Sequence, residues 1–298
     1  MNFNRSILVI AGPTASGKSS LALKLAKDIN GVIINADSRQ IYKELNIGTA
    51  KPTPDSTINE KEWIIDSIPH FLYGFNSITS SYNIYEYQKD VQKILDSLDE
   101  NQIPILTGGT GLYIDSVVFN YELSKTQKSI VRESLREKSV SELQSLIDSN
   151  ILEKLNDSDR NNPVRLIRLI ERKDITNKKG DTLNHLYFVI DKPKDVLDRR
   201  ISQRVDMMIE DGLIEECKEL FDNDLFNNSV IQKTIGYSEF NDYFNDSKSL
   251  DEVRKEIVSN TIKYAKRQRT WFRRNKGALW INNYNDLLES SERFIKTS

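Results

Sequence analysis

Short apolar runs alternate with amphipathic stretches over the first third of the chain. The continuous apolar runs predict buried strands at 7–11, 32–34 and 103–106. Apolar residues that recur three and four positions apart predict helices at 20–29 and 84–98. Because strand and helix alternate, the pattern indicates a parallel sheet that is covered by helices.

The pattern changes in the middle of the chain. Residues 124–179 are polar, their apolar side chains have helical spacing, and no stretch among them predicts a convincing strand. The apolar run 186–190 predicts that the sheet then resumes. Two long amphipathic helices are predicted after it, at 197–208 and 250–264.

This organisation predicts two domains. We expect an α/β core, composed of residues 1–120 and 183–298, with an all-helical insertion at residues 121–182. The length of 298 residues agrees with about two domains.

Composition narrows the class of protein. The net charge of −2 excludes a chain that is basic throughout, so any surface that binds nucleic acid must be local. Cys217 is the one cysteine, which excludes an intramolecular disulfide and a cysteine-based zinc site. No apolar run approaches the roughly 20 residues that cross a bilayer. The polar start leads directly into a strand and leaves no room for a cleavable leader, so we expect a cytoplasmic protein without a membrane partner.

A phosphate-binding loop is predicted between the first strand and the first helix. The sequence GPTASGKS fits the pattern G-x-x-x-x-G-K-[ST]. In this pattern the glycines let backbone N–H groups turn toward phosphate oxygens, the lysine adds positive charge, and the last hydroxyl binds magnesium. The alternative is an ordinary glycine-rich turn between strand and helix. We interpret the segment as a site for a phosphate-bearing ligand, formed by Gly12, Pro13, Thr14, Ala15, Ser16, Gly17, Lys18 and Ser19.

Polar or glycine-rich segments also follow two other predicted strands. Asp37 comes after 32–34, and the segment 107–113, with three glycines, comes after 103–106. Ligands of parallel sheets bind beyond the carboxyl ends of the strands, so Asp37 is a candidate for contact with the ligand or its reaction partner. It is equally suited to cap the next helix. The glycines permit close backbone approach at the same edge, or they form a tight turn without ligand contact.

Positive charge is concentrated in two places. Residues 263–276 read KYAKRQRTWFRRNK, with seven basic residues, three aromatic residues and no acidic residue. This composition favours contact with a nucleic acid that has unstacked bases. The alternative is a helix that packs its aromatic side chains inward and leaves its charges in solvent. A weaker basic cluster in the insertion contains Arg165, Arg168, Arg172 and Lys173.

Two further arginines lie on the helix predicted at 197–208. Arg200 and Arg204 are four positions apart and therefore share one face of this helix. An arginine beside an apolar stripe can reach a phosphate as a charge clamp. The spacing alone favours the commoner alternative, a solvated residue at the rim of the helix.

Taken together, these segments resemble the bacterial tRNA dimethylallyltransferase family, also called tRNA isopentenyltransferases or IPP transferases. The resemblance runs in order from the first strand to the last long helix and covers nearly the whole chain. Its most specific part is GPTASGKS followed by DSRQIY. The other matching segments are NADSRQIY at 35–42, GTAKP at 48–52, GGTGLY at 108–113, RRISQRVDMMIEDGL at 199–213, IGY at 235–237 and AKRQRTWFR at 265–273.

The resemblance implies a P-loop NTPase-like fold and a prenyl transfer. Family members move a dimethylallyl group from dimethylallyl diphosphate to the exocyclic N6 amine of the adenosine on the 3′ side of the tRNA anticodon, and diphosphate leaves. By this resemblance the loop at 12–19 holds the diphosphate, with Mg2+ on Ser19, and Arg204 binds the diphosphate as well. Asp37 matches the family's general base, and Thr110 matches a threonine near the reacting groups.

The resemblance also implies contacts with the anticodon stem-loop of tRNA. The target base has to leave the stack, because a stacked base cannot present its amine for reaction. At 159–163 this chain has Asp-Arg-Asn-Asn-Pro where His-Pro-Asn-Asp-Pro is usual in the family. The implied tRNA contacts are Asp37, Ser38, Arg39, Gln40, Thr110, Asn162, Pro163, Arg165, Arg168, Gly236, Tyr237, Lys266, Arg267, Arg269 and Arg273.

Three alternatives to this function remain. A P-loop small-molecule kinase explains the phosphate loop but not the basic segment 263–276. An adenylate isopentenyltransferase uses the same donor but has little use for a tRNA-sized basic surface. A nucleotide-switched RNA-binding module binds RNA without chemistry. We expect the tRNA-modifying transferase, acting as a monomer.

Overall fold

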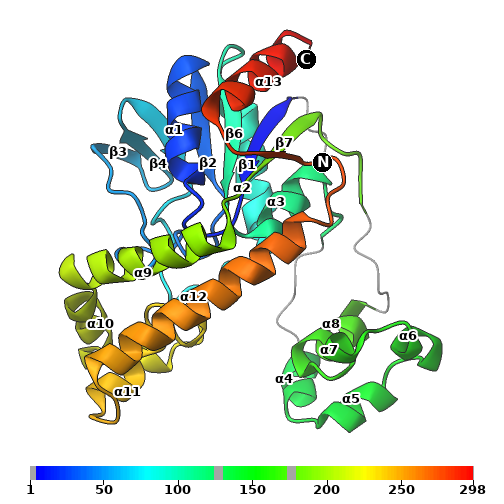
Figure 1. The fold of residues 1–298 in the computed structure, drawn as a ribbon. Helices are drawn as coiled ribbons and strands as arrows, with labels where there is room; N and C mark the ends of the chain where they lie inside the picture. Colours follow the sequence, from blue (N-terminus) through cyan, green and yellow to red (C-terminus); the bar gives the residue numbers. More distant parts are fainter. Residues whose placement is uncertain (1–4, 124–129, 173–178, 298) are drawn as a thin grey trace. The chain divides into compact units, whose positions relative to one another are not determined.

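The computed structural model describes residues 5–123, 130–172 and 179–297 (Figure 1). The chain divides into two compact units, one formed by Met1–Asn120 and Asp181–Ser298 and the other by Tyr121–Gly180. Lys173, predicted as a member of a basic cluster, lies outside the described residues.

The first unit contains a single mixed sheet. Its strands, as far as the chain is described, have the spatial order β3-β4-β5-β2-β6-β1-β7-β8. The strands β5, β2, β6, β1, β7 and β8 are parallel, and β4 and β3 add an antiparallel edge. The strand bounds are β1 (Ile7–Ala11), β2 (Gly31–Asn35), β3 (Ser56–Asn59), β4 (Glu62–Ile65), β5 (Ile68–Phe71), β6 (Ile103–Gly108), β7 (His185–Ile190) and β8 (Leu279–Ile281).

The predicted parallel sheet is confirmed, and it is larger than the apolar runs indicated. The four predicted strands correspond to β1, β2, β6 and β7, each with a run of buried residues. The antiparallel edge was not predicted, because β3 is exposed along its whole length and β4 is only half-buried. An edge strand that faces solvent lacks the continuous apolar run that identifies a central parallel strand.

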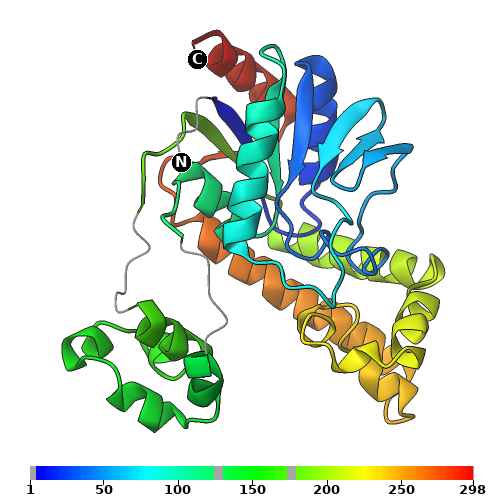
Figure 2. The same ribbon diagram turned by 180° about the vertical axis from the view of Figure 1, so that it is seen from behind.

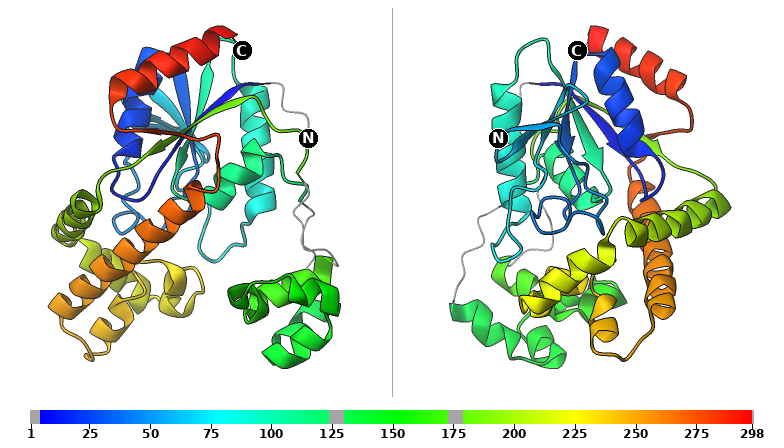
Figure 3. Two further views of the ribbon diagram at one scale, coloured as in Figure 1. Left: turned by 45° about the vertical axis from the view of Figure 1, so that its right-hand side comes forward. Right: turned by 90° about the vertical axis from the view of Figure 1, so that its left-hand side faces the viewer.

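Helices cover both faces of the sheet. Along β1, Leu8 and Ile10 pack in one apolar cluster with α1 and α13, whereas Ile7, Val9 and Ala11 pack in another with α2 and α3. Figure 2 shows α2 in front of the sheet, and Figure 3 shows the sheet between the two layers. The helices of this unit are α1 (Lys18–Asp28), α2 (Ile84–Ser97), α3 (Gly111–Val118), α9 (Lys194–Glu210), α10 (Leu213–Asp222), α11 (Phe240–Phe244), α12 (Leu250–Phe272) and α13 (Tyr284–Thr297).

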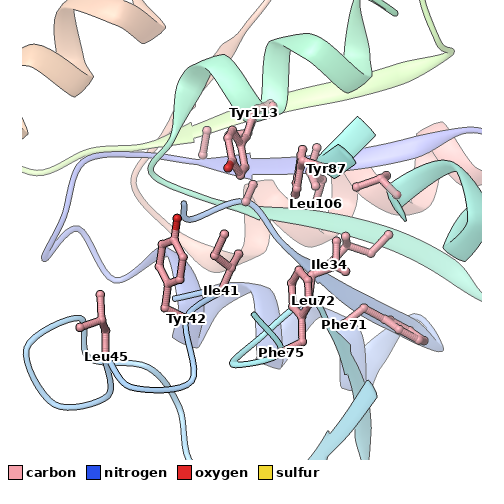
Figure 4. Close-up of a cluster of buried hydrophobic side chains, with 14 of the residues drawn as sticks. Ile34, Ile41, Tyr42, Leu45, Phe71, Leu72, Phe75, Tyr87, Leu106 and Tyr113 are labelled. Carbon is pink, nitrogen blue, oxygen red and sulfur yellow. The ribbon is translucent and has the colours of Figure 1, made fainter. Parts of the chain in front are cut away.

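A buried aromatic cluster fixes the segment that follows β2 (Figure 4). The rings of Tyr87 and Tyr113 stack with their centroids 4.2 Å apart. The hydroxyl of Tyr87 donates to the backbone oxygen of Asn35 at the end of β2, over 2.9 Å. Ile41 and Leu45 are fully buried in the same cluster. The chain just beyond β2 is therefore anchored on both sides of Asp37.

The two long helices α9 and α12 lie beyond the carboxyl edge of the sheet (Figure 1). Both were predicted, and α12 extends to Phe272, farther than its apolar spacing indicated. The guanidinium of Arg254 on α12 donates to Ser202 over 3.0 Å and forms an ion pair with Asp206, both on α9. These contacts fix the two helices against each other.

The second unit is helical. It contains α4 (Ile130–Arg136), α5 (Val140–Ser145), α6 (Ser149–Glu153), α7 (Asp157–Arg160) and α8 (Pro163–Arg172). Its small core is formed by Leu135, Leu143, Leu166 and Ile167. Over the described parts of both units, no helix has the combination of length and apolar character that crossing a membrane requires.

The close packing of α3 against α12 is tested by Gly111→Ala. A Cβ atom at Gly111 would lie 2.2 Å from the indole of Trp271, which is held in place because its Nε1 donates to Asp115 over 2.8 Å. We expect a loss of about 1 to 3 kcal/mol in the free energy of unfolding, measured with denaturant. Gly277→Ala is the matched control, since its nearest atom would be 3.5 Å away. Equal stability of the two variants would contradict this packing.

Candidate active site

Three loops meet at the carboxyl edge of the sheet because β2, β6 and β1 are neighbouring parallel strands. Thr107 links them: its hydroxyl donates to Ile10 over 3.0 Å, and its backbone oxygen accepts from Ala36 over 2.7 Å. A Cβ atom at Gly108 would lie 2.2 Å from the oxygen of Ala36, so this position requires glycine. The phosphate loop, the segment at Asp37 and the glycine-rich segment are thus fixed side by side.

The phosphate loop has the conformation that its sequence predicts. Gly17 has a φ of 93° and precedes Lys18, the first residue of α1. A Cβ atom at Gly12 would lie 2.3 Å from the backbone oxygen of Ile190, so the loop passes close to β7. The hydroxyl of Ser16 is buried and has no hydrogen-bond partner among the described residues. The buried hydroxyl and the start of α1 together suit an anion.

Two cations and one carboxylate interact at this loop. Burial lowers the pKa of Lys18 to about 8, while Asp37 raises it and Arg204 lowers it further. Burial also lowers the pKa of Arg204, and Asp37 opposes that shift. Both cations are thus desolvated with one carboxylate nearby, so a bound anion would favour their charged forms.

The arginines of α9 contact the phosphate loop. Arg204 Nη1 donates to the hydroxyl of Thr14 over 3.2 Å, and Arg200 Nη1 donates to the backbone oxygen of Ala15 over 3.3 Å. The interpretation of both as solvated rim residues, favoured by spacing alone, is wrong for Arg204, which is half-buried and lines the pocket.

Asp37 faces a pocket of about 310 Å³. Its Oδ1 accepts a hydrogen bond from the backbone of Arg39 over 2.9 Å, and the residues after it form turns. The alternative that Asp37 caps a helix is therefore wrong. The pocket is also lined by Thr14 and Arg204, so the carboxylate and the phosphate loop open onto one space.

Thr110 holds the Asp37 segment in place. Its hydroxyl accepts from the backbone of Ser38 over 3.0 Å and donates to the hydroxyl of Ser38 over 3.3 Å. Ser38 and Arg39 line the pocket. Gln40 has a different place, since its amide donates to the backbone oxygens of Thr49 and Ala50 over 2.9 and 3.0 Å. The amide of Gln40 thus supports that loop, and its expected role as a tRNA contact stays a prediction.

Gln268 is a site residue that was not predicted. Its side chain is buried, accepts from the backbone of Thr14 over 2.9 Å and donates to the backbone oxygen of Gly109 over 2.8 Å. A Cβ atom at Gly109 would lie 2.2 Å from this amide, so the glycine-rich segment makes room for α12. The sequence feature that could have predicted this position is the spacing of Gln268 from Tyr264, which places an amide on the inward face of a basic helix.

The basic and aromatic segment of α12 has two different faces. Tyr264, Gln268 and Phe272 face inward, whereas the charged side chains of Lys266, Arg267 and Arg273 are exposed. This agrees with the alternative, a helix that packs its aromatic side chains inward, and contact of the exposed charges with a nucleic acid stays a prediction. Arg269 differs from the other arginines: its guanidinium forms an ion pair with Asp191 over 2.8 Å and is mostly buried. We revise its expected role from a tRNA contact to an anchor of α12.

Tyr237 also supports the site, through hydrogen bonds inside the protein. It is fully buried, its hydroxyl donates to Glu216 over 2.5 Å and accepts from the backbone of Gly48 over 3.1 Å. Its side chain therefore positions the Gly48 loop, and we revise its expected role as a tRNA contact. Gly236, with a φ of 92°, lines the pocket.

The remaining predicted tRNA contacts lie in the second unit. Asn162 accepts a hydrogen bond from the backbone of Arg165 over 3.2 Å at the start of α8. Arg165 forms an ion pair with Asp159. Pro163 and Arg168 are exposed on α8.

Comparisons with known proteins identify the family of this chain. The family model for IPP transferase matches residues 40–275, and that for isopentenyl transferase matches residues 5–68. The chain is 36% identical to the tRNA dimethylallyltransferase of Acetivibrio thermocellus, over 98% of this chain and 95% of that protein. It is 33% identical to the tRNA dimethylallyltransferase of Staphylococcus aureus, over 97% of this chain and 96% of that protein.

A solved structure gives the same assignment. The full-length tRNA isopentenylpyrophosphate transferase from Bacillus halodurans has a TM-score of 0.72 and 31% identity, over 98% of this chain and 96% of that one. The fold and the resemblance predicted from the motifs are both confirmed. This chain belongs to the IPP transferase family.

Proposed function

We propose that this protein transfers the dimethylallyl group of dimethylallyl diphosphate to the N6 amine of the adenosine beside the tRNA anticodon, on its 3′ side. One observation carries the proposal: a single pocket brings a carboxylate, Asp37, together with the anion-binding loop and Arg204. Relatives that carry the name tRNA dimethylallyltransferase support it. We further propose that the protein acts as a monomer.

The phosphate loop holds the diphosphate as a leaving group. The ammonium of Lys18, the guanidinium of Arg204 and the loop N–H groups offset the charge that develops when the allylic carbon–oxygen bond breaks. The hydroxyl of Ser16 supplies a donor that has no other partner among the described residues. Because these donors are already in place, little reorganisation accompanies the reaction.

Magnesium fits the residues at the start of α1. In phosphate sites Mg2+ binds one or two protein oxygens and takes its other ligands from phosphate and water. Ser19 offers an exposed hydroxyl there, and no group of three metal-binding side chains occurs in the described parts of the chain. We propose that Ser19 holds Mg2+, which would neutralise charge on the diphosphate.

Asp37 acts as the general base. The amine nitrogen of the adenine forms a bond to the allylic carbon, and diphosphate leaves with the electron pair of the broken carbon–oxygen bond. A proton of this amine passes to a carboxylate oxygen of Asp37. The target adenine has to leave the anticodon loop to reach the pocket. Ser38 and Arg39 line the space that it would enter. A small-molecule kinase or an adenylate prenyltransferase has no comparable use for the exposed basic face of α12.

The anticodon stem-loop binds exposed basic side chains. On α12 these are Lys266, Arg267 and Arg273, and Arg267 also lies over the ring of Tyr264 with 5.6 Å to its centroid. In the second unit Asn162, Pro163, Arg165 and Arg168 are the candidates. Contacts of this kind bind phosphates and therefore depend on salt.

Asp37→Asn tests the general base directly. Asparagine keeps the oxygen that accepts from Arg39, so the loop stays in place, but the amide cannot take up a proton. We expect transfer of labelled dimethylallyl to tRNA to fall by about a hundredfold to ten-thousandfold, with tRNA affinity within a few-fold of wild type. Asp195→Asn, on the exposed first turn of α9, is the control. Turnover near the wild-type rate in Asp37→Asn would refute the assignment.

The pH dependence of anion binding tests Lys18. Since the pKa of its ammonium is lowered to about 8, the free protein loses this charge as the pH rises through that value. Relative to Lys18→Arg, the wild-type affinity for inorganic pyrophosphate should fall by up to about tenfold per pH unit above that pKa. Calorimetric titration measures it, and Lys27→Arg on the same helix is the control. Parallel profiles for wild type and Lys18→Arg would contradict a charged contact by Lys18.

Salt dependence distinguishes the arginines of α12. Arg267→Gln and Arg273→Gln should each lower the slope of log tRNA affinity against log salt by about 0.7 to 0.9. Arg269→Gln should leave this slope unchanged and lower the free energy of unfolding by about 1 to 3 kcal/mol, because Asp191 loses its partner. Filter binding over a salt series and denaturant unfolding measure the two effects. An unchanged slope for Arg267→Gln and Arg273→Gln would remove this face from the tRNA surface.

A further inference from the structure

We propose that Met208 and Ile257 set the length of the prenyl chain that this protein accepts. The proposal rests on the proposed function, since it concerns the apolar end of the same pocket. Met208 lies on α9 and Ile257 on α12, and both line the pocket. They are 9% and 2% exposed, so each is packed on its other sides.

Helix α9 lines the pocket with three apolar side chains, Ile201, Val205 and Met208, and with one cation, Arg204. Arg200 and Arg204 contact the phosphate loop, whereas Val205 and Met208 belong to the apolar core. Met208 lies one turn beyond Arg204, or about 6 Å along the helix axis. A donor whose diphosphate is held at the loop would therefore direct its hydrocarbon tail toward Met208.

Helix α12 shows the same order. Gln268 contacts the loop at Thr14, and Tyr264 lines the pocket one turn farther. Ile257 comes about 10 Å beyond Tyr264 along the helix axis. Helices α9 and α12 lie together beyond the sheet (Figure 1). Met208 and Ile257 thus line the pocket from two neighbouring helices.

The space in this pocket is small for its two occupants. At about 310 Å³ it is at the lower end of small-molecule sites, yet it has to hold both the prenyl group and the entering purine. Ile235 lines it as well, from the segment next to Gly236. A second isoprene unit that extended toward Met208 and Ile257 would meet packed side chains, which a close-packed interior resists displacing.

Truncation at either position should open a dry apolar cavity that an added isoprene unit can fill. The experiment compares dimethylallyl diphosphate with geranyl diphosphate, with the anticodon stem-loop as acceptor, in wild type, Met208→Ala and Ile257→Ala. We expect the ratio of kcat/KM for geranyl over dimethylallyl to rise at least tenfold in each variant. Met207→Ala is the matched control: it removes the neighbouring methionine, which is 53% exposed, and should leave the ratio unchanged.

The outcomes separate this proposal from the proposed function. If wild type transfers no dimethylallyl group to the stem-loop, the proposed function fails. If wild type is active but the ratio stays within about threefold in both folded variants, or rises equally in Met207→Ala, the length proposal fails. Thermal unfolding checks that the variants fold. Met208→Val and Ile257→Val remove less volume, and they should shift the ratio in the same direction by a smaller factor if an alanine variant does not fold.

Discussion

The desolvated positive charge at the phosphate loop is the constraint on which this site depends. Lys18 and Arg204 are both half-buried, desolvation lowers the pKa of each, and the carboxylate of Asp37 offsets only part of that shift. A folded protein retains such an arrangement where a ligand supplies the missing negative charge. A diphosphate carries this charge, whereas an uncharged ligand would leave the two cations without compensation. The same charges also suit the end of the reaction, because the leaving group is more negative than the bound ester.

Two glycines near this site are required by the packing of α12 and not by a close approach of the backbone to a ligand. Gly109 and Gly111 leave room for Gln268 and Trp271, so the glycine-rich segment is shaped to receive α12. The amide of Gln268 then joins the phosphate loop to this segment, with one hydrogen bond to each. The inward face of α12 is thus part of the catalytic scaffold, while its outward face carries the exposed charges. One helix can therefore connect recognition of a polyanion with the position of the phosphate loop.

The sequence predicted those parts of the molecule that depend on a short continuous stretch of residues. The runs at β1, β2, β6 and β7 are buried on both faces, and the phosphate loop needs particular residue types at fixed spacing. The role of Arg204 could not be derived from the residues alone, because two arginines one turn apart also describe a solvated helix. The buried positions of Gln268 and Arg269 depend on how α12 packs against the loops. Gln40 and Tyr237 belong to matching motifs, yet their contacts are with the protein itself.

The order of side chains along α9 and α12 agrees with the chemistry of an allylic diphosphate, which is an anion joined to a short hydrocarbon. Arg204 and Val205 are adjacent in sequence and line the same pocket, so charged and apolar surfaces meet within one residue. The bond between carbon and oxygen would lie at this boundary. There the guanidinium stabilises the departing oxygen, while the apolar surface excludes water that would otherwise capture the allylic carbon. Since Asp37 lines the same pocket, the carboxylate is available where the amine replaces the diphosphate. Charged and apolar side chains on the two helices thus suit a donor that has a diphosphate at one end and a hydrocarbon at the other.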